Sequence, residues 1–85
     1  MNEFIDRAIA DLRERIAKLE ALKGAEPEVM ETLAHVRRIW SDDRAWIWLL
    51  RHNTVLGGSP IDLLLRGQVE PVRTLLVRIE YGIAS

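Results

Sequence analysis

The spacing of apolar residues restricts the fold of this chain more than any other feature of its sequence. In the first segment the apolar side chains recur at alternating intervals of four and three positions: Ile5, Ile9, Leu12, Ile16 and Leu19. This spacing places them on one stripe of an α-helix. The other apolar segments fit the same period, and none shows the period-two alternation of a half-buried strand. We therefore expect an all-α fold, a small bundle of about five helices whose first helix is long and amphipathic.

Helix boundaries in the first half follow from residues with strong positional preferences. Gly24 is a natural stop for the first helix, and Pro27 suits the first turn of the second. Ser41 predicts the N-cap of a third helix over about 42–52, with two acidic residues in its first turn. This third helix is apolar around most of its circumference, which predicts that it lies at the centre of the fold.

A loop over 53–58 is predicted to follow the third helix. Asn53 tolerates the left-handed conformation that ends a helix. Gly57 and Gly58 permit backbone angles that are closed to other residues.

The second half of the chain contains two more predicted helices. Ser59 predicts an N-cap, with Pro60 at the first helical position and Asp62 at the reciprocal position of a capping box. Gly67 ends this short fourth helix, and a last helix is expected over about 71–82.

Length and composition restrict the class of protein. The 85 residues predict one domain, 1–85, in which residues 1–40 form two amphipathic helices. The chain has no cysteine, which excludes disulfides and thiolate metal sites and favours a reducing, cytoplasmic location. The longest apolar run, residues 45–50, is too short to cross a membrane.

Charge and helix spacing make DNA binding doubtful. The net charge is −1, which argues against non-specific binding to nucleic acid. The predicted third and fourth helices are about seven residues apart, whereas a helix-turn-helix uses a turn of three to four. The fourth helix is also mostly apolar and offers little that would read base edges.

Residues that could carry out chemistry are few and scattered. The two histidines, His35 and His52, lack the second histidine or the cluster of cysteines and carboxylates that a metal site needs. Ser41 and Ser59 are assigned to caps, and no serine has a base positioned beside it. We therefore expect no catalytic residue, no metal and no cofactor, and the chain is not expected to be an enzyme.

Two surfaces leave alternatives open. The stripe of the first helix fits heptad a and d positions over about three repeats, so it suits either packing in the core or self-association in a homodimer. Trp46 and Trp48 are two positions apart and point in nearly opposite directions on a helix. Either the third helix is sandwiched between other helices of the chain, or one tryptophan lines a second packed surface.

Residues 44–84 contain several short motifs in a fixed order: Trp48-Leu49, Asn53, Leu56-Gly57-Gly58-Ser59-Pro60, Asp62-Leu63-Leu64, Gly67, Val72, Leu75 and the closing Arg78-Ile79-Glu80-Tyr81-Gly82. This segment resembles the toxin-binding domain of Xre/MbcA/ParS-type antitoxins. The family usually has proline where this chain has His52, a difference that concerns the loop geometry alone.

The resemblance implies a binding function. Such antitoxins belong to type II toxin-antitoxin pairs and neutralise RES-domain toxins, which consume NAD or transfer parts of it. In the family the C-terminal end blocks the toxin's NAD pocket, and the matching residues here are Arg78, Tyr81, Gly82, Ile83 and Ser85. The aromatic ring of Tyr81 and a terminal carboxylate suit a pocket that binds adenine and phosphate.

The N-terminal half differs from the pattern of the family. Family members usually carry an Xre-like helix-turn-helix domain that binds their own promoter, whereas residues 1–40 are too short for it. A stand-alone interaction or oligomerisation module is therefore an alternative to the antitoxin, and a DNA-binding regulator of its own operon is a weaker one.

Overall fold

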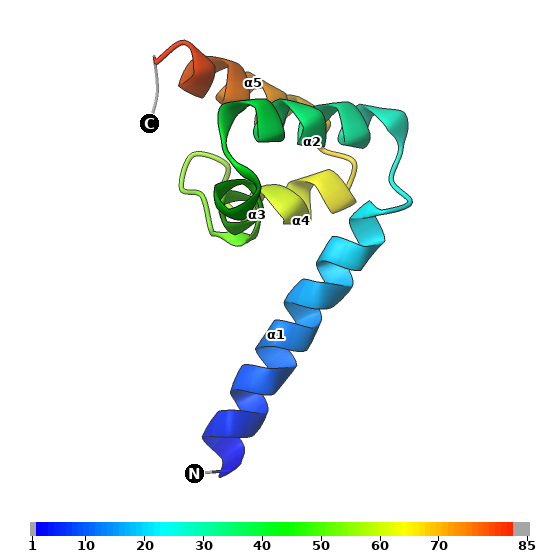
Figure 1. The fold of residues 1–85 in the computed structure, drawn as a ribbon, viewed down its shortest axis with the longest axis vertical. Helices are drawn as coiled ribbons and strands as arrows, with labels where there is room; N and C mark the ends of the chain where they lie inside the picture. The colour runs from blue at the N-terminus through cyan, green and yellow to red at the C-terminus, as the bar shows by residue number, and fades with distance from the viewer. Residues whose placement is uncertain (1, 83–85) are drawn as a thin grey trace.

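The computed structural model describes residues 2–82, which form five α-helices and no strand. The helices are α1 (Asn2–Leu22), α2 (Pro27–Ile39), α3 (Asp42–Leu50), α4 (Pro60–Leu65) and α5 (Val69–Glu80). Helices α2 to α5 pack together into one cluster, which we call the body, and α1 projects away from it (Figure 1). The predicted all-α fold with a long first helix is confirmed.

The core of the body lies between α2, α4 and α5. Six of its apolar side chains are at most 2% exposed, and they come from these three helices: Val36, Ile61, Leu64, Val72, Leu75 and Leu76. Burying such side chains contributes about 1.5–3 kcal/mol each before the entropy of folding is counted. Helix α3 lies at the side of this core and buries Ala45 and Leu49, so its predicted central position is wrong.

The tryptophans divide between the interior and the surface. The ring of Trp48 in α3 stacks on Trp40 at the end of α2, with centroids 5.0 Å apart and planes 30° from parallel. Trp46 points the other way and is 46% exposed. Helix α3 packs against both α2 and α4, but its face with Trp46 and Ile47 is 41–46% exposed, so the predicted sandwich covers only part of α3.

Helix α1 contacts the body only through its C-terminal end. Leu22 is buried and Leu19 is half-buried against the core. The rest of the stripe, Ile5, Ile9, Leu12 and Ile16, is 40–56% exposed. Core packing, one of the two alternatives for this stripe, therefore holds only for its last residue, Leu19. No helix within residues 2–82 has the length and hydropathy of a membrane span.

Two helix boundaries differ from expectation. Helix α3 ends at Leu50, and Arg51 is extended, so Asn53 neither ends the helix nor adopts a left-handed conformation. Helix α5 begins at Val69, two residues before Pro71. Proline is tolerated there because the N–H groups of the first turn have no partner within the helix.

Candidate functional site

Asn53 closes the loop that joins α3 to α4. Its N–H donates to the Gly58 carbonyl at 3.0 Å, and its own carbonyl accepts from the Gly57 N–H at 2.9 Å. Its side-chain Oδ1 accepts from the N–H groups of Val55 at 2.9 Å and Leu56 at 3.1 Å. Gly57 has φ +72°, a conformation that other residues adopt at a cost of roughly 1–2 kcal/mol. The motif residues of 53–58 therefore form one hydrogen-bonded unit.

The predicted capping box at the start of α4 is absent. Pro60 is the first helical residue, as expected, but the Ser59 side chain makes no capping hydrogen bond. Its hydroxyl is buried without a hydrogen-bond partner in the described part of the chain. The Asp62 carboxylate turns instead to α1, where its Oδ1 lies 2.9 Å from Nζ of Lys18. The charged ammonium group of Lys18 attracts the Asp62 carboxylate more strongly than the backbone N–H of Ser59 does. The aspartate side chain is also shorter than the glutamate that usually reaches this N–H in a capping box.

This ion pair shifts the pKa of both partners. The hydrogen bond from Lys18 lowers the pKa of Asp62, and the same bond raises the pKa of Lys18. Both side chains are about one-third exposed, at 31% and 29%. The pair therefore holds the end of α1 against α4 with the modest energy of a partly solvated contact.

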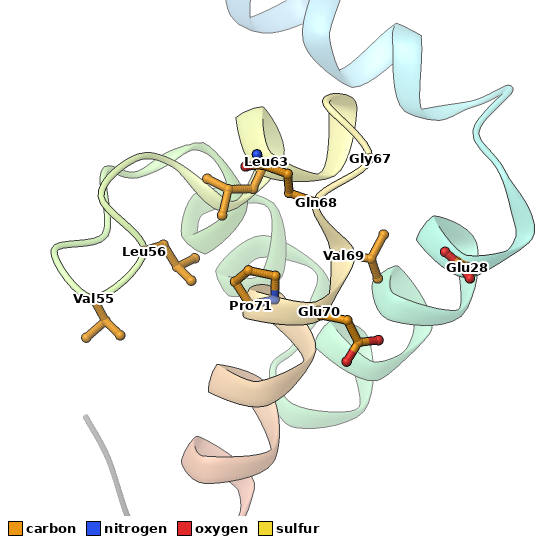
Figure 2. A pocket seen from close by; sticks show the side chains of 9 residues that line it. All are labelled: Glu28, Val55, Leu56, Leu63, Gly67, Gln68, Val69, Glu70 and Pro71. Carbon is orange, nitrogen blue, oxygen red and sulfur yellow. The ribbon is translucent and has the colours of Figure 1, made fainter.

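A hollow of about 510 Å³ lies between the 53–58 loop and the junction of α4 with α5. Figure 2 shows Val55 and Leu56 on the loop side and Glu28 of α2 on the opposite side. The complete lining is Glu28, Val55, Leu56, Leu63, Gly67, Gln68, Val69, Glu70 and Pro71. Its lining combines apolar side chains with two carboxylates and an amide, and it includes none of the residues that the resemblance assigned to toxin binding.

The C-terminal end of α5 presents two of those residues, Arg78 and Tyr81, to solvent. Val77, Arg78 and Tyr81 are exposed, and their spacing of three and four places them on neighbouring positions of one face. Tyr81 is 74% exposed. Gly82 has φ +70°, and its N–H bonds to the Ile79 carbonyl at 3.0 Å, which ends the helix as predicted. Ile83 and Ser85 lie outside the described residues.

A polar seam fixes α5 against α2. Nε2 of His35 lies 2.9 Å from Oε1 of Glu80, immediately before Tyr81. Nearer the start of α5, Arg73 binds Glu31 of α2 at 3.2 Å and Glu70 at 3.1 Å. The His35–Glu80 contact therefore lies in the last turn of α5, next to Tyr81, and its two side chains are 14% and 43% exposed.

Within 2–82, no group of three or more histidine or carboxylate side chains is placed to hold a metal ion. His35 bonds to Glu80, and His52 is exposed beyond the end of α3.

Comparison with known proteins identifies the family. The model of the antitoxin Xre/MbcA/ParS C-terminal toxin-binding domain matches residues 35–82, more than half of the chain. The chain belongs to this family. No curated protein and no solved structure matches it. A domain of this family is the toxin-binding part of an antitoxin, so the partner of this chain is a toxin.

The antitoxin domain begins earlier than the motifs indicated. The match starts at His35, in the second half of α2, rather than near Arg44. The structure explains the difference, because Val36 is fully buried in the core and His35 binds Glu80. Sequence analysis missed both the seam and the Lys18–Asp62 pair. The sequence signal for the seam was weak. It consisted of two acid–base pairs whose spacing is that of neighbours within one helix, and nothing in it linked α2 to α5.

Proposed function

We propose that this antitoxin domain neutralises a RES-domain toxin, an enzyme that consumes NAD, by direct binding. In this proposal the C-terminal end of α5 enters the toxin's active site. The observation that supports it best is the exposure of Tyr81 beside Arg78 at the end of a helix that the body holds firmly. A large aromatic side chain left in solvent next to an arginine is typical of an energetic anchor in an interface.

The chemistry of these side chains suits a pocket that binds NAD. A tyrosine ring can stack where the adenine or nicotinamide ring would lie, and its hydroxyl can bind polar groups at the end of the pocket. The Arg78 guanidinium can pair with a carboxylate through two parallel hydrogen bonds. Ile83 and Ser85 would extend the same edge further into the pocket, and Gly82 would let the chain change direction after α5.

The attachment of α5 to α2 supports tight binding. The His35–Glu80 contact and the buried apolar face of α5 fix the helix up to its last turn. A binding edge held in place before the encounter loses less entropy when the complex forms.

Co-expression tests this function. The chain would be produced with a RES-domain toxin encoded beside its gene, and both growth and co-purification would be scored. We expect growth to be rescued and a stable complex to be recovered. Removal of residues 83–85 should abolish rescue, whereas Thr74→Ala, an exposed change on α5 away from its end, should preserve it. A well-folded chain that neither rescues growth nor binds the toxin would refute the proposal.

Regulation of the chain's own promoter receives no support from the described helices. Residues 51–59 separate α3 from α4, a longer connection than the turn of a helix-turn-helix. Promoter binding that falls steeply with salt would favour the regulator, because phosphate contacts release counterions. Weak, salt-insensitive binding would exclude it.

A further inference from the structure

The exposed part of α1 is the largest apolar feature that toxin binding leaves unexplained. Four residues of the stripe, Ile5, Ile9, Leu12 and Ile16, are 40–56% exposed. They belong to α1, the helix that projects from the body (Figure 1). Phe4 beside them is 68% exposed. Soluble proteins seldom leave such a continuous apolar surface uncovered unless it is an interaction site.

The projecting helix has little support of its own: two ion pairs within it, Asp11–Arg15 and Glu14–Lys18, contribute only a few tenths of a kcal/mol each. Only its last residues pack on the body, whereas most of the stability of a helix in a protein comes from the packing of its apolar face. The strict alternation of four and three gives a narrow seam, which is the pattern of a coiled coil rather than of a helix lying on a broad core. A second helix would cover the stripe and stabilise α1.

We propose that α1 pairs with α1 of a second copy of this chain in an antiparallel coiled coil. The position of the body favours this direction. The body packs at the C-terminal end of α1, around Lys18 and Leu22. A parallel pair would force two bodies together at one end, whereas an antiparallel pair places them at opposite ends of a helix about 31 Å long.

Charged residues beside the apolar stripe of α1 complement one another in the antiparallel register. When Ile9 lies opposite Leu12 of the second copy, Asp6 of each copy lies across from Arg13 of the other. Asp6 and Arg13 are seven positions apart and lie along the same edge of the apolar stripe. In coiled coils, charged pairs at such edges determine which helices pair and in which direction. Neither residue forms an ion pair within residues 2–82. A parallel pair would not bring them together.

The same register gives Phe4 a place. Phe4, Arg15, Lys18 and Leu22 lie on the side of α1 that faces the body. In an antiparallel pair, the body-facing sides of the two α1 helices lie on the same side of the coiled coil. Side chains on a helix lean toward the N-terminus of that helix. The partner's Phe4 therefore points toward a groove of about 360 Å³ whose wall includes Leu22 and Trp46. This contact would cover the exposed tryptophan of α3.

Measurement of molar mass tests the pairing, independently of any toxin. At about 100 µM, above the micromolar Kd expected of a small interface, the chain should have about twice its monomer mass of 9.8 kDa. Leu12→Glu should reduce the mass to that of a monomer, because it places a charge in the seam. Ala10→Glu adds the same charge on the outer face and should leave the dimer intact. A monomeric wild type, or a Leu12→Glu variant that remains dimeric, would overturn the proposal.

A charge swap tests the direction of the helices. Asp6→Arg alone should raise the dimer Kd at least about tenfold, and Asp6→Arg combined with Arg13→Asp should restore most of the affinity. Failure of this restoration would refute the antiparallel register. Phe4→Ala should also raise the Kd, and an unchanged Kd would refute the groove contact. Far-ultraviolet circular dichroism checks that the helices stay folded in each variant.

Discussion

Lys18 of α1 and Asp62 of α4 form an ion pair with 2.9 Å between Nζ and Oδ1. The pair joins the long helix, which lies outside the family match, to a motif residue inside it. Together with buried Leu22 it determines the direction in which α1 leaves the body. The aspartate of the motif therefore acts as an attachment point for α1 rather than as a helix cap.

The pair predicts a pH dependence of stability with two limbs. The pKa of Asp62 is lowered in the folded chain, so its stabilisation is complete above the ordinary aspartate range and is lost as the pH falls below about 4. The pKa of Lys18 is raised, so its stabilisation is complete below the ordinary lysine range and is lost as the pH rises above about 10. The difference in unfolding free energy between wild type and Asp62→Asn should therefore be constant from about pH 5 to 9 and shrink at both ends.

At neutral pH, Asp62→Asn should cost about 0.5–1 kcal/mol, because both partners are partly solvated. Urea unfolding followed by circular dichroism measures this difference. Asp11→Asn is the matched control. It removes the 3.0 Å pair between Asp11 and Arg15, which lies within α1 and is more than half exposed, and it should cost less than about 0.5 kcal/mol. Equal costs for the two variants would contradict the role assigned to Lys18 and Asp62.

The loop predicts different effects for two substitutions of one residue. Asn53→Ala removes the Oδ1 acceptor of the Val55 and Leu56 N–H groups and should cost about 1–2 kcal/mol. Asn53→Asp keeps an acceptor at the same position and should retain most of the stability. The unfolding free energies of both variants test this, and an aspartate variant as unstable as the alanine variant would show that the side-chain acceptor is not what holds the loop.

The two tryptophans of α3 should differ sharply in their contribution to stability. Trp48→Ala removes the stack on Trp40 and leaves a partly buried gap, with an expected cost of about 2–4 kcal/mol. Trp46→Ala, measured at a concentration where the chain is monomeric, should cost less than about 1 kcal/mol. Thermal unfolding by circular dichroism distinguishes the two, and a Trp46 variant that is as unstable as the Trp48 variant would contradict the position of α3.

Local features of the fold could be predicted from the sequence. The helical spacing gave the number and order of the helices, and Pro27, Pro60, Gly67 and Gly82 marked real boundaries. These predictions succeeded because backbone restrictions of proline and glycine act within a few residues. The motifs near α4 also identified the family, since their order is specific even where single residues are not.

Relationships between distant segments could not be predicted in the same way. The stripe of α1 fits a core and a dimer equally well, and only the position of the body shows which residues are covered. Asp62 satisfied the spacing of a capping box, but Lys18, far away in the sequence, competed for its carboxylate. Helix α3 was misplaced because its apolar composition does not reveal that Trp46 faces solvent.

Inhibition of the toxin by the end of α5 is the central claim, and NAD consumption tests it most directly. A purified RES-domain toxin would be titrated with the wild-type chain and with Tyr81→Ala, whose fold should be unchanged because the ring is 74% exposed. We predict that the wild type stops NAD consumption and that Tyr81→Ala inhibits at least about tenfold less well, as expected for loss of an interface anchor. Equal inhibition by the two chains would contradict the claim that the end of α5 occupies the active site.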